Sequence, residues 1–248
     1  MKKKTSLEGL IEITKEVLQA KYAAAELAFL AGSIVRGKGT AFSDLDIVVI
    51  FENLPNAFRE SFYYKNFPVE TFVHTPETLT YFFEIGVESG NPSLAAMVSE
   101  GIEVPCKNHL SEKLKALANE VLAHPPEISV EEIRDFRCWI TDLIDDIREP
   151  RSKAELTASA ATLYAALANF YLRTNNFWSS KSKTIPRSLQ KANPDFCRNF
   201  CESFEELFVA GKPGKVIELT EKLLAPQGGF LFEGIQLDAP ANWQKSIA

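Results

Sequence analysis

Two hydrophobic patterns divide the chain near residue 110. Before it, short runs rich in β-branched and aromatic residues alternate with turns; after it, apolar residues recur at helical spacing almost throughout. The predicted strands are Leu27–Ala31, Ile47–Phe51, Arg59–Tyr64 and Pro68–His74. The predicted later helices are Ser111–Ala123, Val130–Arg148, Lys153–Asn175, Asp195–Ala210 and Lys215–Leu224. The pattern therefore predicts a sheet-containing region over residues 1–110 and a helical bundle over residues 111–248.

Turn chemistry supports the first of these regions. Lys65-Asn66 separates two predicted strands and is typical of a hairpin turn. Thr75-Pro76 combines an N-cap residue with proline at the first helical position, which predicts a helix to about Ser89.

Two aspartates stand at the entrance of the apolar strand Ile47–Phe51. In a strand, residues two apart project from the same face, so Asp44 and Asp46 are expected side by side. Their charges repel, and desolvation at the edge of a core makes ionisation costlier. A divalent cation resolves this, because Mg²⁺ takes hard oxygen ligands. Glu70, in the next apolar strand, is positioned to supply a third carboxylate, which would let the site hold two Mg²⁺ ions.

Gly32-Ser33 provides the complementary half of this site. The pair follows the strand Leu27–Ala31 and precedes a short predicted helical turn, Ile34–Arg36. Such a junction points backbone N–H groups and a hydroxyl at an anion, so we expect it to hold a triphosphate. Arg36 either contacts phosphate or lies on the surface, and the sequence leaves both readings open.

These residues carry a family resemblance. Gly32-Ser33, then Ser43-Asp44-Leu45-Asp46, then one acid in the next apolar strand resembles the signature of the polymerase-β-type nucleotidyltransferase superfamily. The similarity covers about residues 27–74 and is nearest in kind to the bacterial aminoglycoside nucleotidyltransferases. It implies an α+β fold: an N-terminal catalytic domain with a small mixed sheet over residues 1–110, and a C-terminal, substrate-binding helical bundle over 111–248.

The resemblance also implies an activity. A nucleoside monophosphate, AMP from ATP, is expected to move to a hydroxyl of a small, aminoglycoside-like acceptor, with release of pyrophosphate. Asp44 and Asp46 would bind Mg²⁺, and Asp44 would also face the nucleotide. The third acid is Glu70 rather than the commoner Asp, so its role is open between metal ligand and general base.

The predicted helix around residues 131–149 offers a second candidate base. Its apolar stripe is Phe136, Ile140, Leu143 and Ile147. Its acids, on the opposite side, are Asp135, Asp142, Asp145, Asp146 and Glu149. This side is either a solvated face or the wall that attracts a cationic acceptor, in which case Asp142 is the first choice for the base, before Asp145 and Asp146.

A cation-rich stretch follows in the same half of the chain. "NNFWSSKSKTIPRSLQ" combines one tryptophan, Trp178, with Lys181, Lys183 and Arg187. It is either a plain connection anchored by the tryptophan or a loop that contacts the triphosphate, with Lys183 as the candidate nucleotide ligand.

Composition limits the partners. A net charge of −6 disfavours a nucleic-acid partner, which usually demands a basic surface. No apolar run approaches a membrane span, and acids interrupt the only stretch resembling a signal peptide. Four cysteines without such a signal favour reduced thiols in the cytoplasm. Two alternatives stay open, a non-catalytic antitoxin-like regulator and a transferase acting on protein or RNA, as do a monomeric and a homodimeric state.

Overall fold

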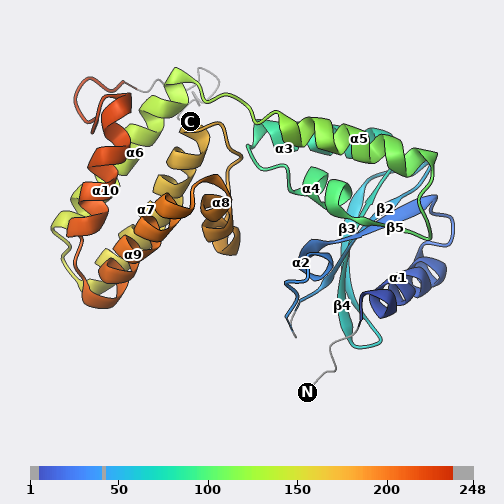
Figure 1. Ribbon diagram of the computed structural model, residues 1–248. Coiled ribbons are helices and arrows are strands. Elements are labelled where there is room, and N and C mark those ends of the chain that lie inside the picture. The colour runs from blue at the N-terminus through green and yellow to red at the C-terminus, as the bar shows by residue number, and fades with distance from the viewer. Residues whose placement is uncertain (1–5, 41–42, 237–248) are drawn as a thin grey trace, which may run out of the picture. The chain divides into compact units, whose positions relative to one another are not determined.

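Strands occur only in the first half of the part of the chain that the computed structural model describes, residues 6–40 and 43–236. The chain divides into two units after Pro126 (Figure 1). The elements of the first unit are α1 (Leu7–Lys21), β1 (Leu27–Ala31), α2 (Gly32–Val35), β2 (Leu45–Ile50), β3 (Phe58–Tyr64), β4 (Phe67–His74), α3 (Pro76–Glu88), α4 (Ser93–Glu100), β5 (Ile102–Val104) and α5 (His109–Ala123). Those of the second are α6 (Val130–Arg148), α7 (Lys153–Thr174), η1 (Ser182–Thr184), α8 (Ile185–Ala192), α9 (Pro194–Ala210), α10 (Gly214–Leu224) and η2 (Ala225–Gln227). The predicted α+β class with a C-terminal helical region is confirmed.

The unit boundary differs from the one expected at residue 110. Helix α5 packs its buried Leu114 and Ala118 into the core beside α3 and α4, so it belongs to the first unit. The periodicity of α5 shows that the segment is helical, but it does not show which neighbour covers its apolar face.

The first unit is built on a mixed sheet. Among the described residues, its five strands lie in the order β3-β4-β2-β1-β5. β2 runs parallel to β4, and the other neighbouring pairs are antiparallel. β5 was missed by the sequence analysis, because a three-residue strand has too little alternation to be recognised.

Helices cover both faces of this sheet. On one face, Leu45, Ile47 and Val49 of β2 pack with α1. On the other face, Val48 and Ile50 pack with α3, α4 and α5 (Figure 1). This two-sided burial explains why β2 is a nearly continuous apolar run.

Two local predictions on the sheet are confirmed. Lys65 (φ 47°) and Asn66 (φ 67°) form the two-residue turn between β3 and β4, with the left-handed backbone that such hairpins require. Thr75 caps α3 with both bonds of a capping box, and Pro76 stands at the first turn. The Lys65-Asn66 turn fixes the register of β3 against β4.

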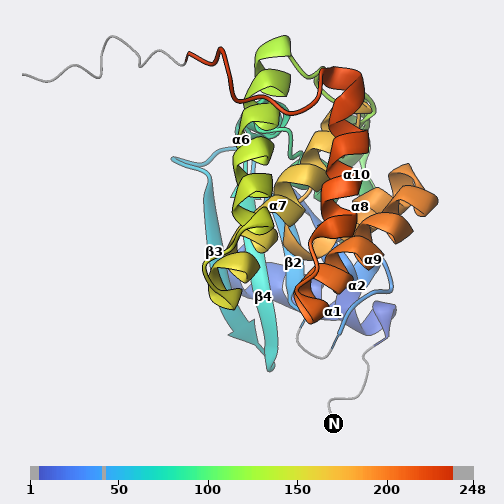
Figure 2. The same ribbon diagram turned by 90° about the vertical axis from the view of Figure 1, so that its left-hand side faces the viewer.

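The second unit is helical throughout its described part. The predicted stripe of α6 is buried at Ile140, Leu143 and Ile147, with Phe136 partly buried, and it packs against α7. Helix α8 was missed because its residues were interpreted as part of a connection. The available sequence signal was the pair of apolar residues Ile185 and Leu189, four positions apart, and both are buried in the structure. Within the described residues, no helix has the length and apolar content that crossing a membrane requires. Figure 2 shows α6 beside α7, as their shared core requires.

The core of the second unit contains an aromatic cluster from α7 and α9. The ring of Phe200 lies edge-on to Tyr164 at 4.7 Å between centroids and 4.7 Å from Phe204. Phe200 is fully buried, and burial raises the pKa of Tyr164 to about 12.

Truncating this ring should destabilise the second unit. We expect Phe200→Ala to lower the free energy of unfolding by about 3–5 kcal/mol, because a large cavity replaces the ring. Val209→Ala, on the exposed side of the same helix, should change it by less than about 0.5 kcal/mol. Denaturant unfolding followed by tryptophan fluorescence compares the two, and equal losses would show that α9 does not pack as described.

Candidate functional site

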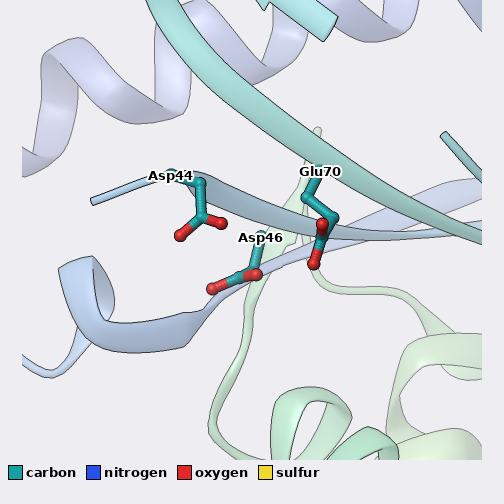
Figure 3. A group of neighbouring side chains, drawn as sticks. All are labelled: Asp44, Asp46 and Glu70. Carbon is teal, nitrogen blue, oxygen red and sulfur yellow. The ribbon is translucent and has the colours of Figure 1, made fainter. Parts of the chain in front are cut away.

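The register of the sheet brings the predicted acids together. Asp46 of β2 is paired with Glu70 of β4 in the parallel ladder, and Asp44 stands two residues before Asp46, just ahead of the strand. One carboxylate oxygen from each of the three lies within 4.8 Å of the others (Figure 3). All three side chains are partly exposed. The structure therefore forms the three-carboxylate cluster that the sequence predicted.

Gly32 approaches this cluster by its backbone. It follows β1 and opens α2 with a φ of +81°, a conformation that favours glycine. A Cβ built on Gly32 would meet Asp46 Oδ2 at 1.9 Å. The glycine thus leaves the space in which the Asp46 carboxylate lies.

Ser33 is linked to the segment that carries the aspartates. Its hydroxyl donates to Ser43 Oγ at 3.2 Å, and Ser43 Oγ also accepts from the backbone N–H of Thr40 at 2.9 Å. The hydroxyl of Ser33 is thereby held next to the residue that precedes Asp44.

Glu70 has partners on the edge strand β3. Its Oε1 accepts from the guanidinium of Arg59 and, at 3.2 Å, from the hydroxyl of Ser61. Both residues were missed as site residues by the sequence analysis. A signal was available for Ser61 alone, because the two-residue turn at Lys65-Asn66 places that residue opposite Glu70.

A small hollow lies beside these acids. It has a volume of about 230 Å³ and is lined by Asp44, Ser61, Phe62, Tyr63, Pro68, Val69 and Glu70. Ligand pockets usually measure about 300–1,000 Å³, so the hollow accommodates a fragment of a ligand rather than a whole nucleotide.

Arg36, the predicted phosphate contact, pairs with Glu100 of α4 at 2.8 Å. A contact of Arg36 with phosphate would have to displace that partner, and it stays a prediction.

Asp142 and Lys183 belong to the second unit, where both are exposed. Their expected roles at the cluster stay predictions. The neighbouring acids of α6 have local partners: Asp145 accepts from Arg148 at 2.9 Å and Asp146 from Ser159 at 3.1 Å. Asp142, Asp145 and Asp146 are all exposed, and the preference for Asp142 as the base stays a prediction.

The donor set suits a hard divalent cation. Three carboxylates that converge on one point, without histidine or cysteine, are the ligands of Mg²⁺ or a similar ion. Asp44, Asp46 and Glu70 would hold such an ion from two neighbouring strands.

A model of the nucleotidyltransferase domain family matches residues 10–154, more than half of the chain. The chain belongs to this family. The matched region contains Gly32, Ser33 and all three acids, so the family assignment and the geometry concern the same residues.

Two further comparisons accompany the family match. A crystal structure of a nucleotidyltransferase-like protein from Exiguobacterium sibiricum 255-15 is similar at 14% sequence identity, covering 88% of this chain and 76% of that one, with a TM-score of 0.47. No curated protein matches the chain significantly.

The approach of Gly32 to Asp46 predicts a difference between two glycine substitutions. Gly32→Ala and Gly37→Ala both place a side chain on a left-handed backbone, so each should lower the free energy of unfolding by about 1–2 kcal/mol. Only Gly32→Ala should also abolish binding of a divalent cation, since its Cβ displaces the Asp46 carboxylate, whereas nothing lies within 4 Å of a Cβ at Gly37. Calorimetric titration with Mn²⁺ and thermal melts measure the two effects. Wild-type Mn²⁺ affinity in Gly32→Ala would contradict the role given to this glycine.

Proposed function

We propose that the protein is a magnesium-dependent nucleotidyltransferase that moves AMP from ATP to a hydroxyl group of a small acceptor. The observation that carries the proposal is the convergence of Asp44, Asp46 and Glu70 within 4.8 Å, inside the region matched by the nucleotidyltransferase domain family. Three acids this close repel one another, and a bound cation would relieve that repulsion.

The proposed reaction is a displacement at phosphorus. The acceptor oxygen attacks the α-phosphorus of ATP, a new P–O bond forms, the bond to the bridging oxygen breaks, and pyrophosphate leaves. Mg²⁺, as two ions, would neutralise charge on the attacking and leaving oxygens. Asp44 and Asp46 would hold the metal, and catalysis would be mainly positioning and electrostatic stabilisation.

The phosphates need ligands besides the metal. Gly32 and Ser33 lie next to the aspartates and present the backbone and hydroxyl groups suited to that task. Arg36 and Lys183 are the proposed cationic contacts.

The proton of the acceptor hydroxyl goes to a carboxylate. Glu70 is one candidate and is already part of the cluster; in the other alternative Glu70 is a third metal ligand and the base is Asp142 of α6. Both are acids with the lone pairs to accept a proton once the hydroxyl lies within hydrogen-bond distance.

The acceptor is proposed to be cationic and aminoglycoside-like. The net charge of −6 and the exposed acids of α6 favour a positively charged small molecule over a nucleic acid. The four cysteines are free thiols, which supports the proposed cytoplasmic location.

Product formation tests the proposal directly. The protein is incubated with each labelled nucleoside triphosphate, Mg²⁺ and a panel of amino sugars, and pyrophosphate and a nucleotidylated product are measured. We expect both with ATP. If the protein binds neither Mg²⁺ nor any nucleotide, and no nucleoside triphosphate releases pyrophosphate with any acceptor, this function is excluded.

Asp46→Asn should abolish the stabilisation of the protein by MgATP while leaving the ligand-free fold as stable as wild type or more so. The reason is that one of three repelling charges is removed together with a metal ligand. Thermal melts with and without MgATP measure this. Asp195→Asn, which removes the same charge from the first turn of α9 in the second unit, serves as the control. If Asp46→Asn gains as much melting temperature from MgATP as wild type, Asp46 is not a ligand.

Glu70→Gln and Asp142→Asn should separate base from ligand. The variant lacking the base should bind MgATP normally and lose about 10²–10⁴-fold in kcat. If Glu70 is a metal ligand, Glu70→Gln instead weakens ATP affinity and Mg²⁺ dependence together. Nucleotide titrations and steady-state kinetics with the acceptor distinguish these results. Wild-type behaviour of both variants would remove both residues from the mechanism.

A further inference from the structure

Glu70, the third acid of the cluster, is already paired with a positively charged side chain of the protein. Arg59 of β3 forms an ion pair with Glu70 Oε1, and Ser61 Oγ donates to the same oxygen at 3.2 Å. Among the described residues, both hydrogen bonds that Glu70 accepts therefore go to Oε1. Asp44 and Asp46 contribute to the cluster from a different strand, β2, and the segment before it.

The fold directs Arg59 toward this position. Ser61 is directly opposite Glu70 in the antiparallel ladder, and Arg59 is opposite Phe72, two residues along β4 on the same face. The guanidinium lies over the Phe72 ring, 5.5 Å from its centroid. A ring beneath it and a carboxylate beside it hold the guanidinium at the rim of the cluster.

The two partners differ in exposure. The side chain of Arg59 is 62% exposed, whereas that of Glu70 is 17% exposed. Arg59 is thus able to leave the pair for solvent, or for another anion, without disturbing the core. Glu70 is the more buried partner, and its strand β4 has a neighbouring strand on each side.

We infer that Arg59 is a built-in counter-ion that competes with a divalent cation for Glu70. Without metal, the guanidinium offsets one of the three negative charges. When a cation enters, Glu70 exchanges its partner, and Arg59 becomes available to an anionic group such as a phosphate of the nucleotide. The inference rests on the proposed function, and it names a residue that sets how strongly the cluster binds metal before nucleotide arrives.

Mn²⁺ binding without nucleotide tests the competition, with free Mn²⁺ measured by electron paramagnetic resonance. Arg59→Gln should bind Mn²⁺ about 3- to 10-fold more tightly than wild type, because Glu70 then carries an uncompensated charge. Arg59→Lys, which keeps the charge, should stay within about 2-fold of wild type. The difference for Arg59→Gln should shrink as salt rises, since the competing charge is solvent-exposed.

Lys107→Gln is the matched control. Lys107 is 66% exposed, pairs with Glu112 at 2.9 Å, and follows β5 at the opposite edge of the sheet, so its removal changes the net charge equally. Its Mn²⁺ affinity should stay within about 2-fold of wild type. All variants should melt close to wild type, because exposed ion pairs contribute little to stability.

The outcomes separate the inference from the proposed function. If wild type binds Mn²⁺, Asp46→Asn does not, and Arg59→Gln matches Lys107→Gln, the metal site stands and the counter-ion role of Arg59 is overturned. If wild type binds no Mn²⁺, or Asp46→Asn binds it as wild type does, the proposed metal site fails and the inference fails with it.

Discussion

Asp44, Asp46 and Glu70 repel one another, and the backbone of the sheet keeps them together. For charges within 4.8 Å, repulsion amounts to about 3 kcal/mol per pair at an effective dielectric constant near 20. The parallel ladder of β2 and β4 fixes Asp46 beside Glu70. Asp44 lies two residues before Asp46, so its side chain projects from the same face. The burial of both sheet faces supplies the energy that opposes the repulsion.

Each acid of the cluster has a different local environment. Asp46 lies where Gly32 has no Cβ, so the backbone of the strand–helix junction comes close to the Asp46 carboxylate. Glu70 lies against Arg59 and Ser61. This asymmetry suits the two tasks proposed for the cluster. Asp46 of β2 and Asp44 just before it would hold the metal, whereas Glu70 would exchange Arg59 for the metal.

The second unit owes its fold to helix packing alone, and its outer surface is free to serve recognition. The buried stripe of α6 faces α7, which leaves the acids of α6 exposed without a structural role in the core. Arg148 offsets the charge of Asp145, and the hydroxyl of Ser159 donates a hydrogen bond to Asp146; all three acids, Asp142 included, are exposed.

Local chemistry in the sequence determined most of the first unit. Apolar runs, the Lys65-Asn66 turn and the Thr75 cap identified the strands and α3, and the spacing of Asp44 and Asp46 identified one face. The sequence pattern could not assign α5 to its unit, because an amphipathic segment does not reveal which element covers its apolar face. It did not identify β5 and α8, because both are too short for a clear periodicity. The partnership of Arg59 with Glu70 and the approach of Gly32 to Asp46 were decided by the tertiary structure, since strand register and a positive φ bring together residues that are distant in the chain.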